Sequence, residues 1–181
     1  KDTQTLSFSI VTADNPELKA VAEIIKNNWE KIGVKVDIKI FEQGALNQNI
    51  IRPRKYDAIL FGEVIGEDSD PYAFWHSSQR NDPGLNIALY ANSKVDKILE
   101  DARATLDQTE RAKKYAAFET ELKNDSPAVF IYSPDFIYVL SSDIKGMDLG
   151  ELTVPAERFL NVYQWYKDTD WVWKIFTRKT N

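Results

Sequence analysis

The sequence predicts an α/β fold, in which the strands of a central sheet alternate with flanking helices. Residues 5–11 alternate polar and apolar side chains, which is the period of a half-buried strand. Apolar residues between 18 and 32 then recur at three- and four-residue spacing, which indicates one face of an amphipathic helix. Residues 34–40 alternate again. A strand, a helix and a second strand form a βαβ unit, which we expect to be parallel and right-handed.

Local signals place the ends of this first helix. Asn15 is a good N-cap residue, Pro16 suits the first helical position, and Glu17 adds an acid to the first turn. Gly33 follows the last apolar position, where a residue with positive φ ends many helices. The helix is therefore expected to lie between Asn15 and Gly33.

A buried strand and a long loop are expected next. Residues 45–54 show no regular pattern, and 56–62 are short and almost entirely apolar, which predicts a strand covered on both faces. Residues 62–86 are rich in Gly, Pro, Ser and acids. Loops of that length are uncommon in compact domains unless they carry a function, so this loop is the first place to look for a site.

Two helices and two further strands are expected after the loop. Two pairs of residues resemble capping boxes, and each is followed by apolar residues at helical spacing. Residues 127–132 and 136–140 are rich in β-branched and aromatic side chains, which favours strands. The chain shows no repeat and no linker, so we expect one domain. The capping pairs are Ser93 with Asp96 and Asp107 with Glu110.

Composition excludes several classes of function. The chain has 181 residues and a net charge of -5, which gives no general attraction to nucleic acid or anionic membranes. It contains no cysteine, which excludes disulfides and thiolate chemistry. No apolar run reaches the roughly 18 residues that span a bilayer. The chain opens at Lys1 without a signal peptide, and we expect it to be a fragment of a longer protein.

The order of these segments resembles the C-terminal lobe of the family 5 solute-binding proteins, the peptide/nickel type that serves ABC transporters. Each motif is weak alone, but all occur in the family's order. The segments are residues 28–34 (N-W-E-K-I-G-V), residues 56–60 (Y-D-A-I-L) leading to Asp70-Pro71, residues 92–99 (N-S-K-V-D-K-I-L) with 107–111 (D-Q-T-E-R), and residues 122–130 (L-K-N-D-S-P-A-V-F).

The resemblance implies a lobe of the type II periplasmic-binding class, with a central mixed sheet and flanking helices. Residues 1–166 would form the lobe, and 167–181 a tail that packs on the missing N-terminal lobe. The whole protein would capture a peptide or similar small solute between its lobes and deliver it to a membrane permease. Such a protein is extracytoplasmic, either periplasmic or a cell-surface lipoprotein, and is not an enzyme. No cofactor and no metal are implied.

The resemblance also indicates a site for the solute. In peptide-binding members an acid pairs with the α-ammonium group of the peptide, and Glu67 falls on that position, with Asp68 one residue away. This chain has Glu where the family has Asp, and Glu63-Val64 stands where the family usually has Trp. With these departures the solute stays open: a peptide is expected first, and an opine-like compound, a sugar and a metal chelate are alternatives.

The residues themselves leave alternatives open. Glu63, Glu67, Asp68 and Asp70 place four acids within eight residues, which suits an ammonium group, a hard cation such as Ca²⁺, or a solvated acidic loop. Asp70-Pro71 is expected to be architectural.

Aromatic residues and the single histidine follow the acids. Tyr72, Phe74 and Trp75 are candidates for an apolar wall of the binding cleft, with core packing as the alternative for Phe74, and His76 is a candidate ligand contact. Two other classes of function are weighed. One is a metal-dependent hydrolase that uses the acidic loop with His76. The other is a protein–protein interaction module that uses the aromatic C-terminal tail.

Overall fold

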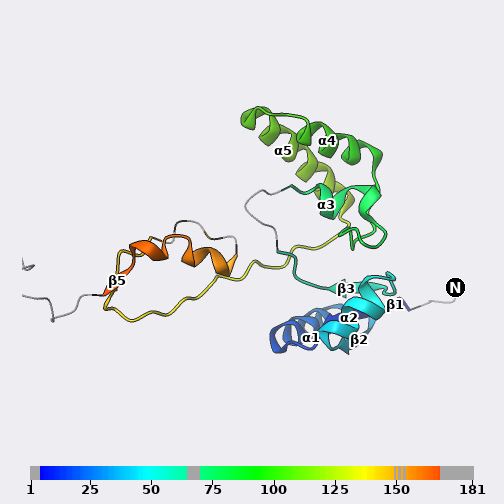
Figure 1. Ribbon diagram of the computed structural model, residues 1–181. Coiled ribbons are helices and arrows are strands. Elements are labelled where there is room, and N and C mark those ends of the chain that lie inside the picture. The colour runs from blue at the N-terminus through cyan, green and yellow to red at the C-terminus, as the bar shows by residue number, and fades with distance from the viewer. Residues whose placement is uncertain (1–4, 65–69, 149, 151, 153, 168–181) are drawn as a thin grey trace, which may run out of the picture. The chain divides into compact units, whose positions relative to one another are not determined.

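The computed structural model describes residues 5–64, 70–148, 150, 152 and 154–167 (Figure 1). The chain divides into two compact units. Unit 1 comprises Lys1–Glu63 and Ser69–Phe130, and unit 2 comprises Val64–Asp68 and Ile131–Asn181. Each unit is described by itself. Residues 168–181 of the predicted tail, 167–181, lie outside the described residues, so the boundary expected after residue 166 stays a prediction.

The βαβ unit predicted at the start of the chain is confirmed. Strand β1 (Ser7–Ala13), helix α1 (Pro16–Glu30) and strand β2 (Lys35–Phe41) follow one another, and β1 and β2 pair in parallel along their whole length. The Asn15 side chain accepts from the backbone N–H groups of Glu17 and Leu18, which caps α1. Gly33 adopts a φ of 86° just beyond the helix, as its position after the last apolar residue predicts.

Strand β3 (Ala58–Leu60) lies on the other side of β1, so the sheet has the order β2-β1-β3 and is parallel throughout. The two faces of β1 bury different cores because successive side chains of a strand point in opposite directions. Ile10 packs with Ala22 of α1, whereas Val11 packs with Leu46. The predicted α/β class is confirmed, and the central strand is the one most fully buried.

The stretch 45–54, which has no pattern in the sequence, forms two short helical turns. They are α2 (Gln43–Leu46) and a π-helical turn η1 (Asn47–Ile51). The Glu42 carboxylate accepts from the N–H groups of Gly44 and Ala45 and so caps α2. These turns bury Leu46 and Ile51 against the face of the sheet opposite α1.

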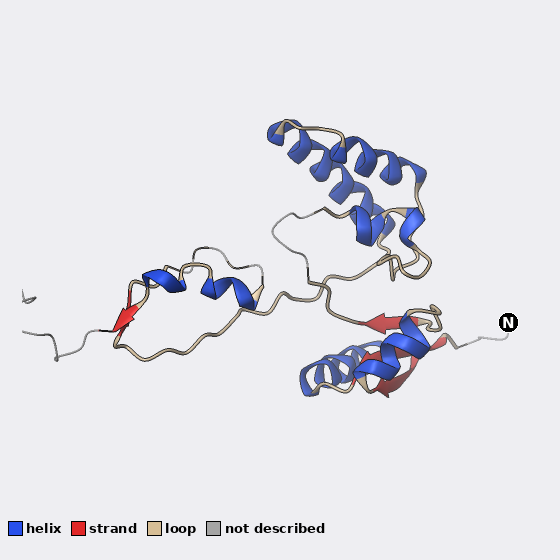
Figure 2. Cartoon of the chain, in the orientation of Figure 1, coloured by secondary structure: helices blue, strands red, loops and turns tan. Residues whose placement is uncertain are grey.

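The rest of unit 1 is helical (Figure 2). Four elements follow one another along the chain. They are α3 (Tyr72–Trp75), the 3-10 turn η2 (Ser77–Gln79), α4 (Ser93–Arg103) and α5 (Gln108–Asp125). Their shared core contains Trp75, Val95, Leu99, Phe118 and Leu122, all buried.

The predicted capping boxes are half right. Asp107 caps α5 by accepting from the N–H of Glu110, as expected. Helix α4, however, is capped by Asn92, whose side chain accepts from the N–H groups of Lys94 and Val95. Ser93 is therefore the first residue inside the helix, and Asp96 is free for another role.

The two strands predicted at 127–132 and 136–140 do not form among the described residues. Both segments are drawn as loop in Figure 2. Composition favours a strand, but a strand also needs a neighbour to complete its backbone hydrogen bonds. Here the apolar side chains stay outside, with Val129 at 80% and Val139 at 85% exposure. Within the described part of the chain, these two segments therefore have the composition of strands but do not pair with a strand.

Unit 2 has little regular structure. Its strands β4 (Ile144–Lys145) and β5 (Tyr166–Lys167) form a short antiparallel pair. Two 3-10 turns, η3 (Pro155–Phe159) and η4 (Val162–Gln164), precede β5. Most of the order in this unit comes from aromatic side chains, which are treated below.

Candidate functional site

The loop that follows β3 begins at the edge of the sheet where binding sites of open α/β proteins usually lie. Strands β1 and β3 are parallel and pair Thr12 with Leu60, so the chain leaves both strands at the same edge. Ligands of open α/β sheets bind beside the carboxyl ends of the strands. The acids predicted to contact a ligand, Glu67 and Asp68, follow in this loop but lie outside the described residues. Their role stays a prediction.

Glu63 is the predicted site acid that the structure does describe. It is an exposed residue three positions after β3, yet partial burial raises the pKa of its carboxyl group to about 7. Burial also raises the pKa of Tyr56, and the Glu63 charge adds to that rise. The Tyr56 hydroxyl donates to the Ile87 carbonyl at 2.5 Å, which orients the phenol. A carboxyl group with a pKa near neutrality gains much from a nearby cation, because the cation restores its charge.

Asp70 has the architectural role that its position before Pro71 suggests. One carboxylate oxygen accepts from the N–H of Tyr72 at 3.0 Å and so begins α3. The other lies 2.9 Å from Nε of Arg103, at the end of α4. The carboxylate is therefore committed to joining two helices, which makes it a poor partner for a ligand.

Tyr72 lies between two nitrogen-bearing side chains. The Arg103 guanidinium carbon is 4.2 Å from the centre of the Tyr72 ring. The His76 ring stacks on Tyr72 with ring centres 4.1 Å apart and an angle of 18°. Two groups this close to one ring cannot share a face, so Tyr72 is held between them. The ring is half-buried and presents its edge, not its face, to the solvent.

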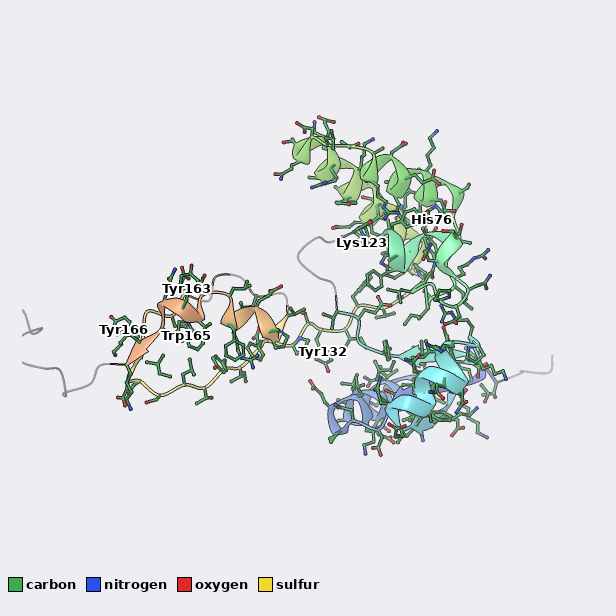
Figure 3. The ribbon with its side chains drawn as sticks, viewed as in Figure 1. His76, Lys123, Tyr132, Tyr163, Trp165 and Tyr166 are labelled. Carbon is green, nitrogen blue, oxygen red and sulfur yellow. The ribbon has the colours of Figure 1, made fainter. Side chains whose placement is uncertain are left out.

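His76 is buried, with 9% of its side chain exposed (Figure 3). Its Nδ1 lies 2.8 Å from Oγ of Ser78 and 3.1 Å from the backbone nitrogen of the same residue. Its Nε2 has no hydrogen-bond partner among the described residues, although Glu100 and Asp96 lie 3.4 and 3.9 Å away. The ring is thus fixed on one side and faces acids on the other.

Trp75 belongs to the core of the helical part of unit 1. Its residue exposure is 8%, and its ring lies within 6.4 Å of the rings of Tyr90, Phe118 and Phe130. That packing accounts for a tryptophan at this position without a ligand. The prediction that Trp75 and His76 also touch a ligand remains open, but both present little surface to one.

The sequence reading missed the face of α4 that supports this site. Asp96, Glu100 and Arg103 are spaced by four and three residues, so they share one face of the helix. Asp96 accepts from the backbone N–H of Ser77 at 2.8 Å and from its hydroxyl at 2.6 Å. The helical spacing of these charged residues was visible in the sequence. What the sequence could not show is that α3 and η2 pack against that face.

Metal and membrane features were also sought within the described ranges. These residues contain no group of three or more His, Asp or Glu side chains placed to hold a metal ion. Within the same ranges, no helix has both the length and the apolar character needed to cross a membrane.

Comparison with known proteins agrees with the family resemblance seen in the sequence. Residues 1–85 match the family model described as "Bacterial extracellular solute-binding proteins, family 5 Middle". Oligopeptide-binding protein AppA of Bacillus subtilis is 27% identical over 168 residues, which are 92% of this chain and 30% of that protein. These matches support the resemblance of this chain to the family 5 extracellular solute-binding proteins, whose model covers 85 of its 181 residues. Heme-binding protein A of Haemophilus influenzae is 29% identical over 76% of the chain and 25% of its own length.

Solved structures of the family agree with this resemblance. AppA of Bacillus subtilis, solved with a nonapeptide, superposes with a TM-score of 0.74 at 26% identity and covers 93% of this chain. NikZ of Campylobacter jejuni, solved with Ni(L-His), gives a TM-score of 0.67 at 29% identity over 92% of the chain. The chain spans about a third of the length of these family 5 proteins, at 33% and 34%. The predicted fold class is therefore that of the family.

Proposed function

We propose that this chain forms one side of a solute-binding cleft in a longer extracytoplasmic protein that serves an ABC importer. The single observation that carries the proposal is the position of the acidic loop. It leaves the sheet at the carboxyl edge, beside the loop that follows β1, in a chain that resembles a solute-binding family. The relatives named above are binding proteins, which does not favour a hydrolase or an interaction module.

The solute class follows from the acids. The proposed ligand contacts are Glu67 and Asp68, together with the other candidates from the sequence, Glu63, Tyr72, Trp75 and His76. A carboxylate that meets an ammonium group forms a charge-assisted hydrogen bond of about 1.5–3 kcal/mol. A peptide with a free amino terminus is the solute that uses this bond. AppA of Bacillus subtilis, whose solved structure holds a nonapeptide, supports this choice.

The rest of the parent protein completes the mechanism. A second, N-terminal lobe would supply the opposite wall of the cleft, and solute binding would favour the closed arrangement of the two lobes. The closed protein would then deliver the solute to a membrane permease. The parent would be a periplasmic protein or a cell-surface lipoprotein. In this arrangement the 181-residue chain alone binds solute weakly or not at all.

Calorimetry on the parent protein tests the proposal. A short peptide such as tri-alanine is compared with its N-acetylated form, which keeps the backbone and loses the ammonium group. We expect acetylation and the Glu67→Gln substitution each to weaken binding about 10-fold or more, which corresponds to the loss of one charge-assisted bond. Glu119→Gln, a change of the same kind on the exposed face of α5, serves as control.

Two results would contradict the proposed contacts and solute class. One is unchanged affinity of Glu67→Gln for the free peptide, which would remove the acidic loop from the site. The other is an absence of binding for peptides, nickel–histidine and heme alike, since these are the solutes named for the relatives. Micromolar binding by the 181-residue chain alone would contradict the two-lobe arrangement.

A further inference from the structure

An arginine in unit 2 is surrounded by aromatic rings. The Arg158 guanidinium carbon lies 4.2 Å from the centre of the Phe159 ring, 5.0 Å from that of Tyr138 and 5.5 Å from that of Phe136. Trp165 completes the group, with its ring 5.9 Å from Phe159 and 6.5 Å from Tyr138. We call these five residues the Arg158 cluster. Cation–π contacts of this kind fix the position of a guanidinium but leave its N–H groups to find acceptors.

Two N–H groups of the Arg158 cluster lack a hydrogen-bond acceptor among the described residues. Nε of Arg158 and Nε1 of Trp165 are buried and have no hydrogen-bond partner in the part of the chain that the structure describes. Nη1 of Arg158 donates to the Pro155 carbonyl, so the guanidinium is held in place by its own turn. Burying an N–H without an acceptor is unfavourable, and most such groups in folded proteins are paired.

The chemistry of these two groups specifies the missing partner. Both are donors and neither can accept, so the partner must supply acceptor oxygens. One donor carries a positive charge in a largely apolar setting, where an anionic oxygen compensates far better than a neutral one. A carboxylate, with two oxygens, can serve both donors.

The surroundings of the Arg158 cluster favour a polypeptide as the source of that carboxylate. Leu160 and Tyr163, on the turns that flank the cluster, are 70% and 77% exposed, and Val162 is 48% exposed. Figure 3 shows Tyr163 and Trp165 on opposite sides of η4. Exposed apolar side chains next to unpaired donors are typical of a protein interface whose partner surface is missing. The relatives are about three times as long as this chain, which provides that other half.

We propose that Arg158 and Trp165 together bind the carboxylate of an Asp or Glu side chain, presented by an apolar surface of the parent polypeptide outside these 181 residues. This inference rests on the proposed function, because it needs the second lobe of the parent. It adds the chemistry of the contact: one acid, two donors, and apolar side chains around them.

Thermal unfolding of the ligand-free parent, with the 181-residue chain in parallel, tests the proposal. Arg158→Met removes the charge and keeps most of the volume, and Trp165→Phe keeps a ring and removes the N–H. Lys97→Met removes an exposed charge elsewhere and is the control. We expect Arg158→Met to lower the Tm of the parent at pH 7 by about 3 °C or more, and that of the 181-residue chain by less than about 1 °C.

The pH dependence identifies the partner as an acid. A paired carboxylate stabilises the parent above its unfolded pKa and loses that effect as the pH falls through its folded pKa. The difference in Tm between wild type and Arg158→Met should therefore persist from pH 7 to about 5 and shrink as the pH falls from about 4.5 to about 2. Three described acids of unit 2 have local partners: Glu157 accepts from the N–H of Val154, Asp148 accepts from the N–H of Gly150, and Asp143 pairs with Lys167. The 181-residue chain contains every acid of unit 2, so subtracting the pH dependence of its own Tm difference removes their titration. Arg158→Lys should retain part of the effect.

Three outcomes would overturn the proposal. Equal losses of Tm in the parent and in the 181-residue chain would make Arg158 a stabiliser of its own unit. A loss in the parent that does not change with pH would exclude an acid. A loss of solute affinity with no change in the Tm of the ligand-free parent would assign the carboxylate to the solute. If Arg158→Met does not fold, Trp165→Phe gives the same comparison. The first two outcomes are read from the Tm of the ligand-free protein and need no solute, so they do not depend on whether the proposed function is correct.

Discussion

Asp70 and Arg103 form an ion pair, 2.9 Å from Oδ2 to Nε, that joins the first residues after the acidic loop to the last turn of α4. The same guanidinium covers the Tyr72 ring. The pair thus fixes Asp70, which follows the acids that we propose to meet the solute, to the helical part of unit 1.

Arg103→Ala is expected to lower the free energy of unfolding by about 1 kcal/mol. The partly exposed ion pair contributes about 0.2–1 kcal/mol and the contact with the ring of Tyr72 about 0.5–1 kcal/mol. Urea unfolding followed by circular dichroism measures the change. The free energy of unfolding of Arg103→Lys should lie between those of wild type and Arg103→Ala, because lysine keeps the charge and loses the planar group. Lys113→Ala, which removes an exposed pair with Glu110, should cost less than about 0.5 kcal/mol. If both alanine variants cost the same, the pair with Asp70 has no special role.

Asp96→Ala is expected to lower the free energy of unfolding by more than a substitution on a helix surface usually does. The carboxylate accepts two hydrogen bonds from Ser77, one of them from a backbone N–H. Leaving that N–H unpaired should lower the free energy of unfolding by about 1–3 kcal/mol. Asp101→Ala, on the exposed side of the same helix, is the matched control and should stay within about 0.5 kcal/mol of wild type. Hydrogen exchange of the Ser77 amide should rise in the Asp96 variant alone.

The two leucines of the α4 region allow a test of the helical core with one chemical change. Leu99 is fully buried, and Leu106 has 94% of its surface exposed. Leu99→Ala should cost about 2–5 kcal/mol because it removes apolar burial and leaves a cavity. Leu106→Ala should change stability by less than about 0.5 kcal/mol. Comparable losses from the two substitutions in denaturant titrations would place Leu106 in an interface of the 181-residue chain.

Local sequence signals predicted the first half of unit 1 well. Asn15, Pro16 and Gly33 set the bounds of α1 through interactions within a few residues, so no knowledge of the rest of the fold was needed. The alternation of β1 and β2 was equally local. The fold class followed from these elements, since a strand, a helix and a strand pack in one way.

The predictions from sequence fail where the local structure depends on residues far away along the chain. Asp96 lies three residues after Ser93, which predicts Ser93 as the cap. In the structure, however, Asp96 accepts from Ser77, and Asn92 caps the helix. Residues 127–132 and 136–140 have the composition of strands, and composition does not supply a neighbouring strand. The candidate site shows the same division. Its acids were visible as a cluster, whereas the stack of Arg103, Tyr72 and His76 depends on how α4 packs against α3.

Glu63 provides a prediction whose sign depends on pH. Burial raises the pKa of its carboxyl to about 7, so the folded protein holds this proton more tightly than the unfolded chain does. Between the unfolded pKa of about 4.3 and pH 7 the folded state binds more protons, and stability falls as the pH rises. Glu63→Gln stays neutral and avoids this loss. It should therefore be more stable than wild type at pH 8 and equal to it near pH 4, with a gain of less than about 1 kcal/mol because the exposed group is screened by solvent.

Glu42→Gln is the matched control because it should behave in the opposite way. Hydrogen bonds from the N–H groups of Gly44 and Ala45 lower the pKa of the Glu42 carboxyl. Its charge therefore stabilises the folded state above the unfolded pKa, and that contribution is lost as the pH falls through the folded pKa. Glu42→Gln should be less stable than wild type at pH 8, and the difference should vanish in acid. Thermal unfolding of the two variants from about pH 2.5 to pH 8 measures both trends. If the Glu63 and Glu42 variants shift in the same direction, the carboxyl of Glu63 is solvated like any surface acid and does not present a near-neutral group to a cationic solute.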